Sequence, residues 1–138
     1  MIETLFPEKV VKQNNCCVND QFFVKAKPQI KLTDTPLLTI GKGGFIVLDF
    51  GQEMCGCVHI LFTFDNTKDL FVRLRLGESV AETYAEKGEN NADNHHSVRD
   101  CVLPVVLAGD VSGSESGFRF ARIDNISSSE VKISKIFV

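Results

Sequence analysis

The stretch from residue 70 to residue 76 constrains the fold of this chain more than any other segment. Apolar residues alternate there with other residues, at positions Leu70, Val72, Leu74 and Leu76. A period of two places these side chains on one face of an extended strand and leaves the intervening residues on the other face. Because two of the intervening residues are arginines, the pattern predicts a strand with one face buried in an apolar core.

Similar signals recur over short segments of the rest of the chain. We predict further strands at residues 37–40, 45–50, 54–64, 97–103, 118–123 and 131–138, and weaker ones at 10–11, 16–18 and 21–30. Turn-forming residues separate them, including a glycine cluster at 41–44 and an Asp-Asn-Thr-Lys turn at 65–68. The sequence shows no sustained helical period and no internal repeat. Short strands at roughly even spacing predict an all-β chain, built as a sandwich of two antiparallel sheets.

The 138 residues have the length of one domain. We therefore predict a single β-sandwich domain over residues 1–138, with residues 1–20 as an N-terminal arm. Residues 82–96 are strongly polar, and we expect a long loop there with one helical turn near 81–86. Loops of this length inside a compact domain are usually functional or mobile. This loop is therefore the first place where we expect a ligand.

Charge and composition argue against several classes of function. The net charge is -3 and the lysines are scattered, whereas nucleic-acid binding needs clustered basic residues. The N-terminus lacks the apolar segment of a signal peptide, and no apolar run approaches the length of a membrane helix. The five cysteines are an odd number, which fits a reducing compartment better than a disulfide framework. We therefore expect a cytoplasmic protein with neither a nucleic-acid nor a membrane partner.

Three residues of the kind that bind zinc follow one another at alternate positions. Cys55, Cys57 and His59 would share one face of a strand, with His95 or His96 as a fourth ligand. Zinc-binding cysteines usually lie across a tight turn, however, and these lie inside an apolar segment, where cysteine commonly acts as a small buried apolar residue. We expect no metal and no cofactor, and a small metal-dependent enzyme stays an alternative.

Carboxylates near strand ends raise the question of a glycosidase acid pair. Asp49, Glu53 and Glu78 are of the right type, but such a pair needs two carboxyl groups on opposite sides of a bond. Acidic residues near strand ends are too common to support that interpretation. The sequence also carries no G-x-S-x-G, P-loop or Rossmann pattern and no local signature of a Cys–His nucleophile. We therefore expect no enzymatic activity from this chain alone.

A cluster of polar residues follows the long loop. His95, His96, Arg99 and Asp100 come directly after an acidic, Asn-rich segment. Charged and hydrogen-bonding residues beside a long loop are typical of the rim of a ligand site. The alternative is a solvated loop that returns to a strand, with Arg99 and Asp100 in a weak local ion pair. The residues alone leave both interpretations open.

Three motifs, in order, resemble a known family. DFGQE at 49–53 with Gly56 after it, VRLRLGE at 72–78 and GFRFARI at 117–123 are similar to segments of bacterial α-L-rhamnosidase-like glycoside hydrolases. The family pattern is D-F-G-x-E-x-x-G, an alternating strand that ends in Gly-Glu, and then G-F-R-Y-x-R, where Phe120 replaces the tyrosine. The segment HSVRD at 96–100 lies between the last two motifs. The resemblance covers about residues 45–138 and concerns the N-terminal, non-catalytic β-domain of those enzymes.

The resemblance implies a jelly-roll-like sandwich that precedes an (α/α)6 catalytic barrel, with the glycosidase acids in the barrel. This chain contains no barrel sequence, so the resemblance implies a non-catalytic, carbohydrate-associated accessory domain. Its expected partners are a rhamnose-type sugar and a catalytic domain of the same or a related chain. The alternative function is a purely structural or oligomerisation domain.

Six residues are our candidates for carbohydrate contact: Glu78, His95, His96, Arg99, Asp100 and Arg119. We expect Glu78 to accept hydrogen bonds from loop amides. Because Arg119 lies between Phe118 and Phe120, we expect it to point away from both and to pair with Glu78 or Asp49. These charges either bind sugar or hold loops across the sandwich. The chain has no Trp, so a sugar site would depend on Tyr84, a Phe or hydrogen bonds.

Overall fold

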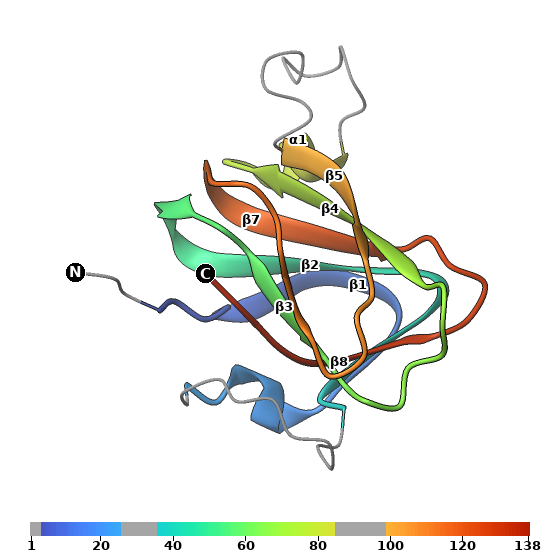
Figure 1. Cartoon of the computed structure of the whole chain (residues 1–138). Coiled ribbons are helices and arrows are strands. Elements are labelled where there is room, and N and C mark those ends of the chain that lie inside the picture. The colour runs from blue at the N-terminus through green and yellow to red at the C-terminus, as the bar shows by residue number, and fades with distance from the viewer. Residues whose placement is uncertain (1–3, 26–35, 85–98) are drawn as a thin grey trace.

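The computed structural model describes residues 4–25, 36–84 and 99–138 (Figure 1). The strands are β1 (Lys9–Val18), β2 (Leu38–Gly56), β3 (His59–Phe62), β4 (Phe71–Gly77), β5 (Asp100–Pro104), β6 (Asp110–Ser112), β7 (Ser116–Asn125) and β8 (Val131–Phe137). A 3-10 helix, η1 (Asp20–Phe23), and a short α-helix, α1 (Val80–Tyr84), complete the described elements. In these ranges neither helix has the length and apolarity needed to cross a bilayer.

The strands form an all-β sandwich in which every pairing is antiparallel. Hydrogen bonds link them in the order β5-β4-β7-β2-β8-β3-β6, and β1 pairs with β2. Figure 1 shows β4, β7 and β2 side by side, with β8 below them in the view. Residues 45–56 of β2 pair with β7, whereas residues 38–40 pair with β8. One long strand therefore belongs to both layers, and the predicted sandwich of two antiparallel sheets is confirmed.

The bend of β2 between the layers lies in the glycine cluster at 41–44. Gly43 has a φ of 71°, a left-handed conformation that glycine adopts without the steric cost of a Cβ atom. The β1–β2 register is also irregular here, since Asn14 pairs with Phe45 but Cys16 pairs with Ile40. The cluster predicted as a turn is thus the corner at which the chain passes from one layer to the other.

The apolar core lies between the two layers. Leu70, Val72, Leu74 and Leu76 are all at most 3% exposed, which confirms the face predicted from their alternation. They belong to one core cluster with residues of the facing strands, among them Ile60 and Ile133. On the opposite face of β4, Arg75 is only 6% exposed. This outer face is therefore not open to solvent along its whole length, and α1 packs on it against β4 and β7.

Several predicted elements differ from the structure. Residues 54–64 form two strands, because β2 ends at Gly56 and β3 begins at His59. Residues 20–23 are helical, since the Asn19 side chain accepts the Gln21 amide and caps η1; residues 26–30 lie outside the described ranges. The two weak signals at 10–11 and 16–18 are one strand, β1, and the three-residue β6 was not predicted. Pairing with β2 and β3 holds these two strands, whose own sequences show little alternation.

The N-terminal segment is fastened to the sandwich before β1 begins. Leu5 and Val138 exchange two backbone hydrogen bonds, of 2.9 and 2.8 Å, and the Glu8 amide donates to the Asp49 carbonyl at 2.8 Å. The first of these contacts joins the segment to the end of β8, and the second joins it to the middle of β2. Residues 4–9 therefore run beside the exposed part of β2 that forms the candidate site.

Candidate functional site

The DFGQE motif forms a wide bulge in β2. Asp49 pairs with Phe120 of β7, and the next pairing joins Met54 to Phe118. Residues 50–53 therefore lie opposite Arg119 alone, and residues 51–53 are exposed. Gly51 has a φ of 86°, in the left-handed region that favours glycine. The bulge turns the backbone away from β7 and opens the sheet surface at this point.

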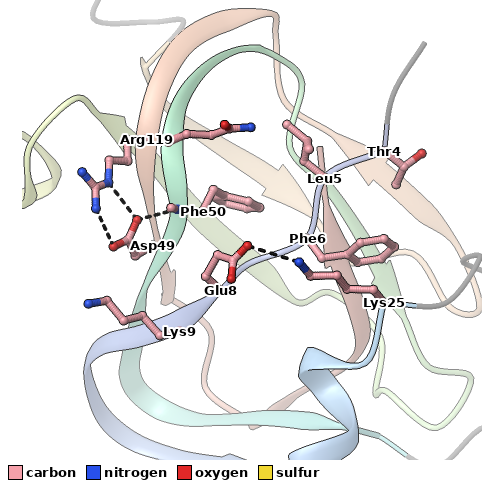
Figure 2. Close-up of a pocket in the computed structure, with 11 residues that line it drawn as sticks. Thr4, Leu5, Phe6, Glu8, Lys9, Lys25, Asp49, Phe50 and Arg119 are labelled. Atoms are coloured by element: carbon pink, nitrogen blue, oxygen red, sulfur yellow. Dashed lines mark hydrogen bonds and ion pairs between the residues drawn. The ribbon is translucent and has the colours of Figure 1, made fainter.

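A pocket of about 680 Å³ lies between this bulge and the N-terminal segment (Figure 2). Residues 4–9 form one wall, residues 49–52 form the other, and Arg119 and Lys25 complete it. The walls are in close contact, because a Cβ atom at Gly51 would come 2.8 Å from Cγ of Glu8. Glu8 in turn forms an exposed ion pair with Lys25 at 3.2 Å. The pocket is thus assembled from four segments that are distant in the sequence.

A two-pronged ion pair between Asp49 and Arg119 lies at the inner edge of the pocket (Figure 2). Arg119 donates from Nε to Oδ1 at 3.0 Å and from Nη2 to Oδ2 at 3.1 Å. The Gly51 amide also donates to Oδ1, at 2.7 Å. Asp49 is 3% exposed, whereas 40% of the Arg119 side chain is exposed. The buried carboxylate therefore holds a guanidinium group that faces the solvent.

The pair changes the protonation equilibria of both groups. The hydrogen bonds from Arg119 do most to lower the pKa of Asp49, burial opposes them, and the Gly51 amide and the nearby charge of Lys9 add to the lowering. The hydrogen bonds to Asp49 raise the pKa of Arg119. Asp49 is therefore ionised over the whole neutral and mildly acidic range, and its oxygens are already occupied by donors of the chain.

We expect Asp49→Asn to make the free energy of unfolding less dependent on pH. The pKa of Asp49 in the folded chain lies below its ordinary value of 3.8, so the ionised carboxylate stabilises the fold above that pH. This contribution is lost as the pH falls through the lowered pKa. The difference in unfolding free energy between the natural chain and Asp49→Asn should be largest near pH 6 and shrink below pH 3.8.

Urea unfolding of both proteins between about pH 6 and pH 2.5 measures this difference. Asp69→Asn is the matched control, because Asp69 is exposed and has a φ of 61°, which Asn tolerates well. A difference between the natural chain and Asp49→Asn that stays constant over this pH range would contradict the prediction.

The prediction for Arg119 is confirmed in part. It pairs with a carboxylate, and the register of β2 and β7 selects Asp49 rather than Glu78. The expectation that it points away from Phe120 is wrong, since its guanidinium carbon lies 5.0 Å from the centroid of that ring. The bulge interrupts the regular alternation of side chains, so neighbouring residues of β7 approach one another at this point.

Glu78 and Arg99 belong to a second cluster, at the end of β4. Arg99 donates from Nη2 to the Gly117 carbonyl at 2.8 Å and lies 3.7 Å from a Glu78 oxygen and 3.9 Å from a Glu82 oxygen. The other Glu82 oxygen accepts the amides of Glu78, at 2.6 Å, and Ser79, at 3.1 Å. Glu82, not Glu78, is therefore the acceptor for the loop amides. This cluster joins the ends of β4 and α1 to the start of β7.

Asp100 has a different partner from the one expected. It accepts a hydrogen bond from Nε of Arg73 at 2.7 Å, across the β4–β5 pair, and only 10% of its side chain is exposed. The local ion pair between Arg99 and Asp100 that belonged to the alternative interpretation is not formed, because the two adjacent side chains contact different neighbours. Of the six candidates, Glu78 and Arg99 are brought together and Arg119 belongs to the pocket; His95 and His96 lie outside the described residues.

Tyr84, one of the groups on which a sugar site could depend, is already in contact with a cationic side chain. The guanidinium of Arg122 lies 4.4 Å from its ring centroid and 4.1 Å from that of Phe45. The two rings are edge to face, with centroids 6.1 Å apart. Arg122 also forms two hydrogen bonds to Asp124, of 2.8 and 2.9 Å. This stack covers part of the outer face of the sheet, and one face of Tyr84 is not free for a sugar.

The three candidate zinc ligands, Cys55, Cys57 and His59, do not share one strand face. Cys55 lies near the end of β2, Cys57 lies in the connection, and His59 begins β3, where its Nδ1 lies 2.9 Å from an Asp110 oxygen. The break after Gly56 removes the regular alternation that would have aligned them. Cys55 is exposed rather than buried, and its hydrogen bond to Glu115 raises the pKa of the thiol. In the described ranges, no three His, Cys, Asp or Glu residues gather as a metal site.

Sequence reasoning did not find the N-terminal wall of the pocket. Glu8, Lys9 and Lys25 lie in segments with weak structural signals, and nothing in their spacing indicates a site. The glycine of the DFGQE motif was the one local signal, since a glycine in a strand often marks a bulge. The remaining pocket residues meet only through the fold.

Comparison with known proteins identifies the fold. No protein-family model and no curated protein matches this sequence. Among solved structures, a rhamnosidase from Klebsiella oxytoca with rhamnose bound is similar, with a TM-score of 0.63 and 18% identity over 99% of this chain. A truncated AlyQ with CBM32 and alginate lyase domains gives a TM-score of 0.55 and 15% identity over 98% of this chain. This chain spans only 28% and 33% of those two chains.

A third structure matches over nearly its whole length. The CBM32 of AlyQ in complex with 4,5-unsaturated mannuronic acid has a TM-score of 0.51 and 15% identity, and the match covers 96% of each chain. At such identities the likeness concerns the fold. The chain is therefore an all-β sandwich similar in fold to the CBM32 of AlyQ and to part of a rhamnosidase.

Proposed function

We propose that this chain is a non-catalytic carbohydrate-binding accessory domain of an α-L-rhamnosidase-like glycoside hydrolase. It binds a sugar in the pocket between the β2 bulge and the N-terminal segment, and it packs on a catalytic domain of the same or a related chain. The observation that carries the proposal is the exposed guanidinium of Arg119, which the buried Asp49 holds at the pocket edge. The proposal is supported by the similar fold of two solved structures that have a sugar bound, the rhamnosidase and the CBM32 of AlyQ.

The pocket has the properties of a small-ligand site. Its volume of about 680 Å³ lies within the range of 300–1,000 Å³ that is usual for such sites. Arg119, Lys9 and Gln52 supply hydrogen-bond donors, and Phe6 contributes apolar surface beside them. Sugar hydroxyls need donors and acceptors at fixed positions, and the Asp49 ion pair fixes one of these donors. The Glu78–Arg99 cluster then has the structural role of holding loop ends together.

A sugar titration followed by amide NMR tests the proposal. We expect L-rhamnose or one of a panel of hexoses to cause saturable shifts at residues 5–9, 49–53 and 119. Arg119→Ala should abolish these shifts, because it removes the donor that Asp49 holds at the pocket edge. Arg99→Ala is the matched control: it removes an arginine of the same sheet end that lies outside the pocket.

Two outcomes contradict parts of the proposal. Shifts that cluster at residues 78–100 and disappear in Arg99→Ala would place the site at the originally predicted loop and its flanks. An absence of shifts with every sugar up to about 50 mM, far weaker than useful binding, would contradict sugar binding altogether. Melting temperatures of both variants distinguish a lost ligand contact from a lost fold.

A structural or oligomerisation role is the second candidate, because apolar side chains are exposed on the outer face of β4 and β5. Phe71 is 44% exposed, Val102 56% and Ile126 51%. Phe71 pairs with Pro104, and the Ser127 hydroxyl bonds both backbone groups of Phe71, which brings Ile126 close. Such a patch suits packing against another protein surface. Self-association in solution that Val102→Lys abolishes would favour this candidate over sugar binding.

A further inference from the structure

The pocket contains more hydrogen-bond donors than the chain itself uses. A guanidinium group has five N–H donors, and Arg119 directs two of them to Asp49. Its other N–H groups have no partner among the described residues, although 40% of the side chain is exposed. Lys9 also lines the pocket, and within the described ranges no ion pair or hydrogen bond engages its ammonium group.

The carboxylate nearest these donors is already engaged. Oδ1 of Asp49 accepts from Arg119 and from the Gly51 amide, and Oδ2 accepts from Arg119. Glu8 forms its ion pair with Lys25 on the other side of Asp49 (Figure 2). The exposed Glu53 also acts on Arg119 through its charge, but it does not line the pocket. A ligand that enters therefore meets the donors of Arg119 and Lys9 beside a carboxylate, Asp49, that is already engaged.

We infer that this pocket binds an acidic saccharide, in which the carboxylate of a uronic acid accepts hydrogen bonds from Arg119 and Lys9. The inference rests on the proposed function and names the class of its sugar. A carboxylate accepts hydrogen bonds only, so it matches donors that lack acceptors, and charge-assisted bonds are about twice as strong as neutral ones. The pocket has room for a sugar ring beside the carboxylate, since its volume is about 680 Å³. Asp49 is a positioning residue for Arg119.

The test compares uronic acids with the neutral sugars of the same configuration. D-galacturonate, D-glucuronate and D-mannuronate are titrated against D-galactose, D-glucose and D-mannose, with amide NMR as the readout. We expect at least one uronate to bind about tenfold more tightly than its neutral counterpart at low salt. This advantage should fall to about threefold or less in 0.5 M NaCl, because salt screens exposed charges. The shifts should centre on residues 9, 49–53 and 119.

Charge variants separate the two cations. Lys9→Gln should weaken uronate binding about threefold and neutral-sugar binding less, because glutamine keeps an N–H donor but carries no charge. Arg119→Lys keeps the charge but loses the planar fork, so we expect about a tenfold loss. Glu53→Gln removes a repelling charge and should strengthen uronate binding. Lys42→Gln is the control, because Lys42 is exposed in the β2 corner and lies outside the pocket lining.

Three outcomes would overturn the inference. Neutral sugars that bind as tightly as uronates, with no effect of Lys9→Gln, would overturn it and leave the proposed function intact. Failure of every sugar and uronate to bind would overturn both. Equal shifts with acetate or inorganic phosphate at the same concentrations would assign the pocket to simple anions rather than saccharides. Melting temperatures confirm that each variant is folded.

Discussion

Phe118→Ala should lower the free energy of unfolding by about 4 kcal/mol, the largest effect that we expect from one substitution. Phe118 is 1% exposed and lies in the core cluster between the layers. Its ring meets Phe50 edge to face, with centroids 5.9 Å apart and planes at 85°. Removal of the ring loses the free energy gained by burying its apolar surface. It also leaves a cavity that the two layers cannot close, because strand pairing fixes their backbones.

Urea unfolding at neutral pH measures this change. Phe64→Ala is the matched control, since 54% of Phe64 is exposed and its loss should change the stability by less than about 0.5 kcal/mol. Phe118→Ala should also weaken any ligand binding at the bulge, because Phe118 precedes Arg119 and pairs with Met54 at the end of the bulge. Similar losses of stability in both variants would contradict the central place of Phe118 in the core.

Asn125→Ala should cost about 3 kcal/mol of unfolding free energy, the second-largest effect. Asn125 is 3% exposed, and its amide nitrogen lies within hydrogen-bond distance of the carbonyls of Ile40 at 2.9 Å, Gly41 at 3.2 Å and Ser129 at 2.8 Å. Its oxygen accepts the Ser127 amide at 2.9 Å. Alanine would remove four hydrogen bonds, one of them buried and the others partly buried, and the loss of these bonds is the source of the cost.

Asn14→Ala is the control for this substitution, because Asn14 is exposed and its side chain has no partner among the described residues. Asn125→Asp tests the direction of the bonds, since aspartate keeps the acceptor for Ser127 but loses the donors. We expect it to be at least as destabilising as Asn125→Ala. Stability within about 0.5 kcal/mol of the natural chain for either change at position 125 would show that the network is dispensable.

Regular alternation made much of the fold predictable. β4, β7 and β8 were expected close to their observed bounds, because a strand with one buried face leaves a period of two in its sequence. β1, β6 and the break between β2 and β3 were not. β1 is mostly exposed and is held by backbone pairing with β2, so its side chains carry little of the signal. The break lies at residues 57–58, inside a run whose composition resembles that of one continuous strand.

The candidate site was also predictable only in part. That Arg119 pairs with a carboxylate was expected from its place between two phenylalanines and from the acidic residues Asp49 and Glu78. The β2–β7 register decides that Arg119 pairs with Asp49 and not with Glu78. The directions of the side chains at the strand end decide that Arg99 contacts Glu78 and that Asp100 contacts Arg73.

The all-β class and the buried face of β4 can be read from the sequence alone, because both depend on neighbours in the chain. The position of residues 4–9 along the pocket, and the pairing of Lys9 with Asp49, follow from the tertiary fold. Those positions depend on backbone hydrogen bonds between segments far apart in the chain. Packing of the core brings these segments together. The pattern of side chains along a strand indicates which face of the strand is buried. It does not indicate which distant segment of the chain lies beside the other face.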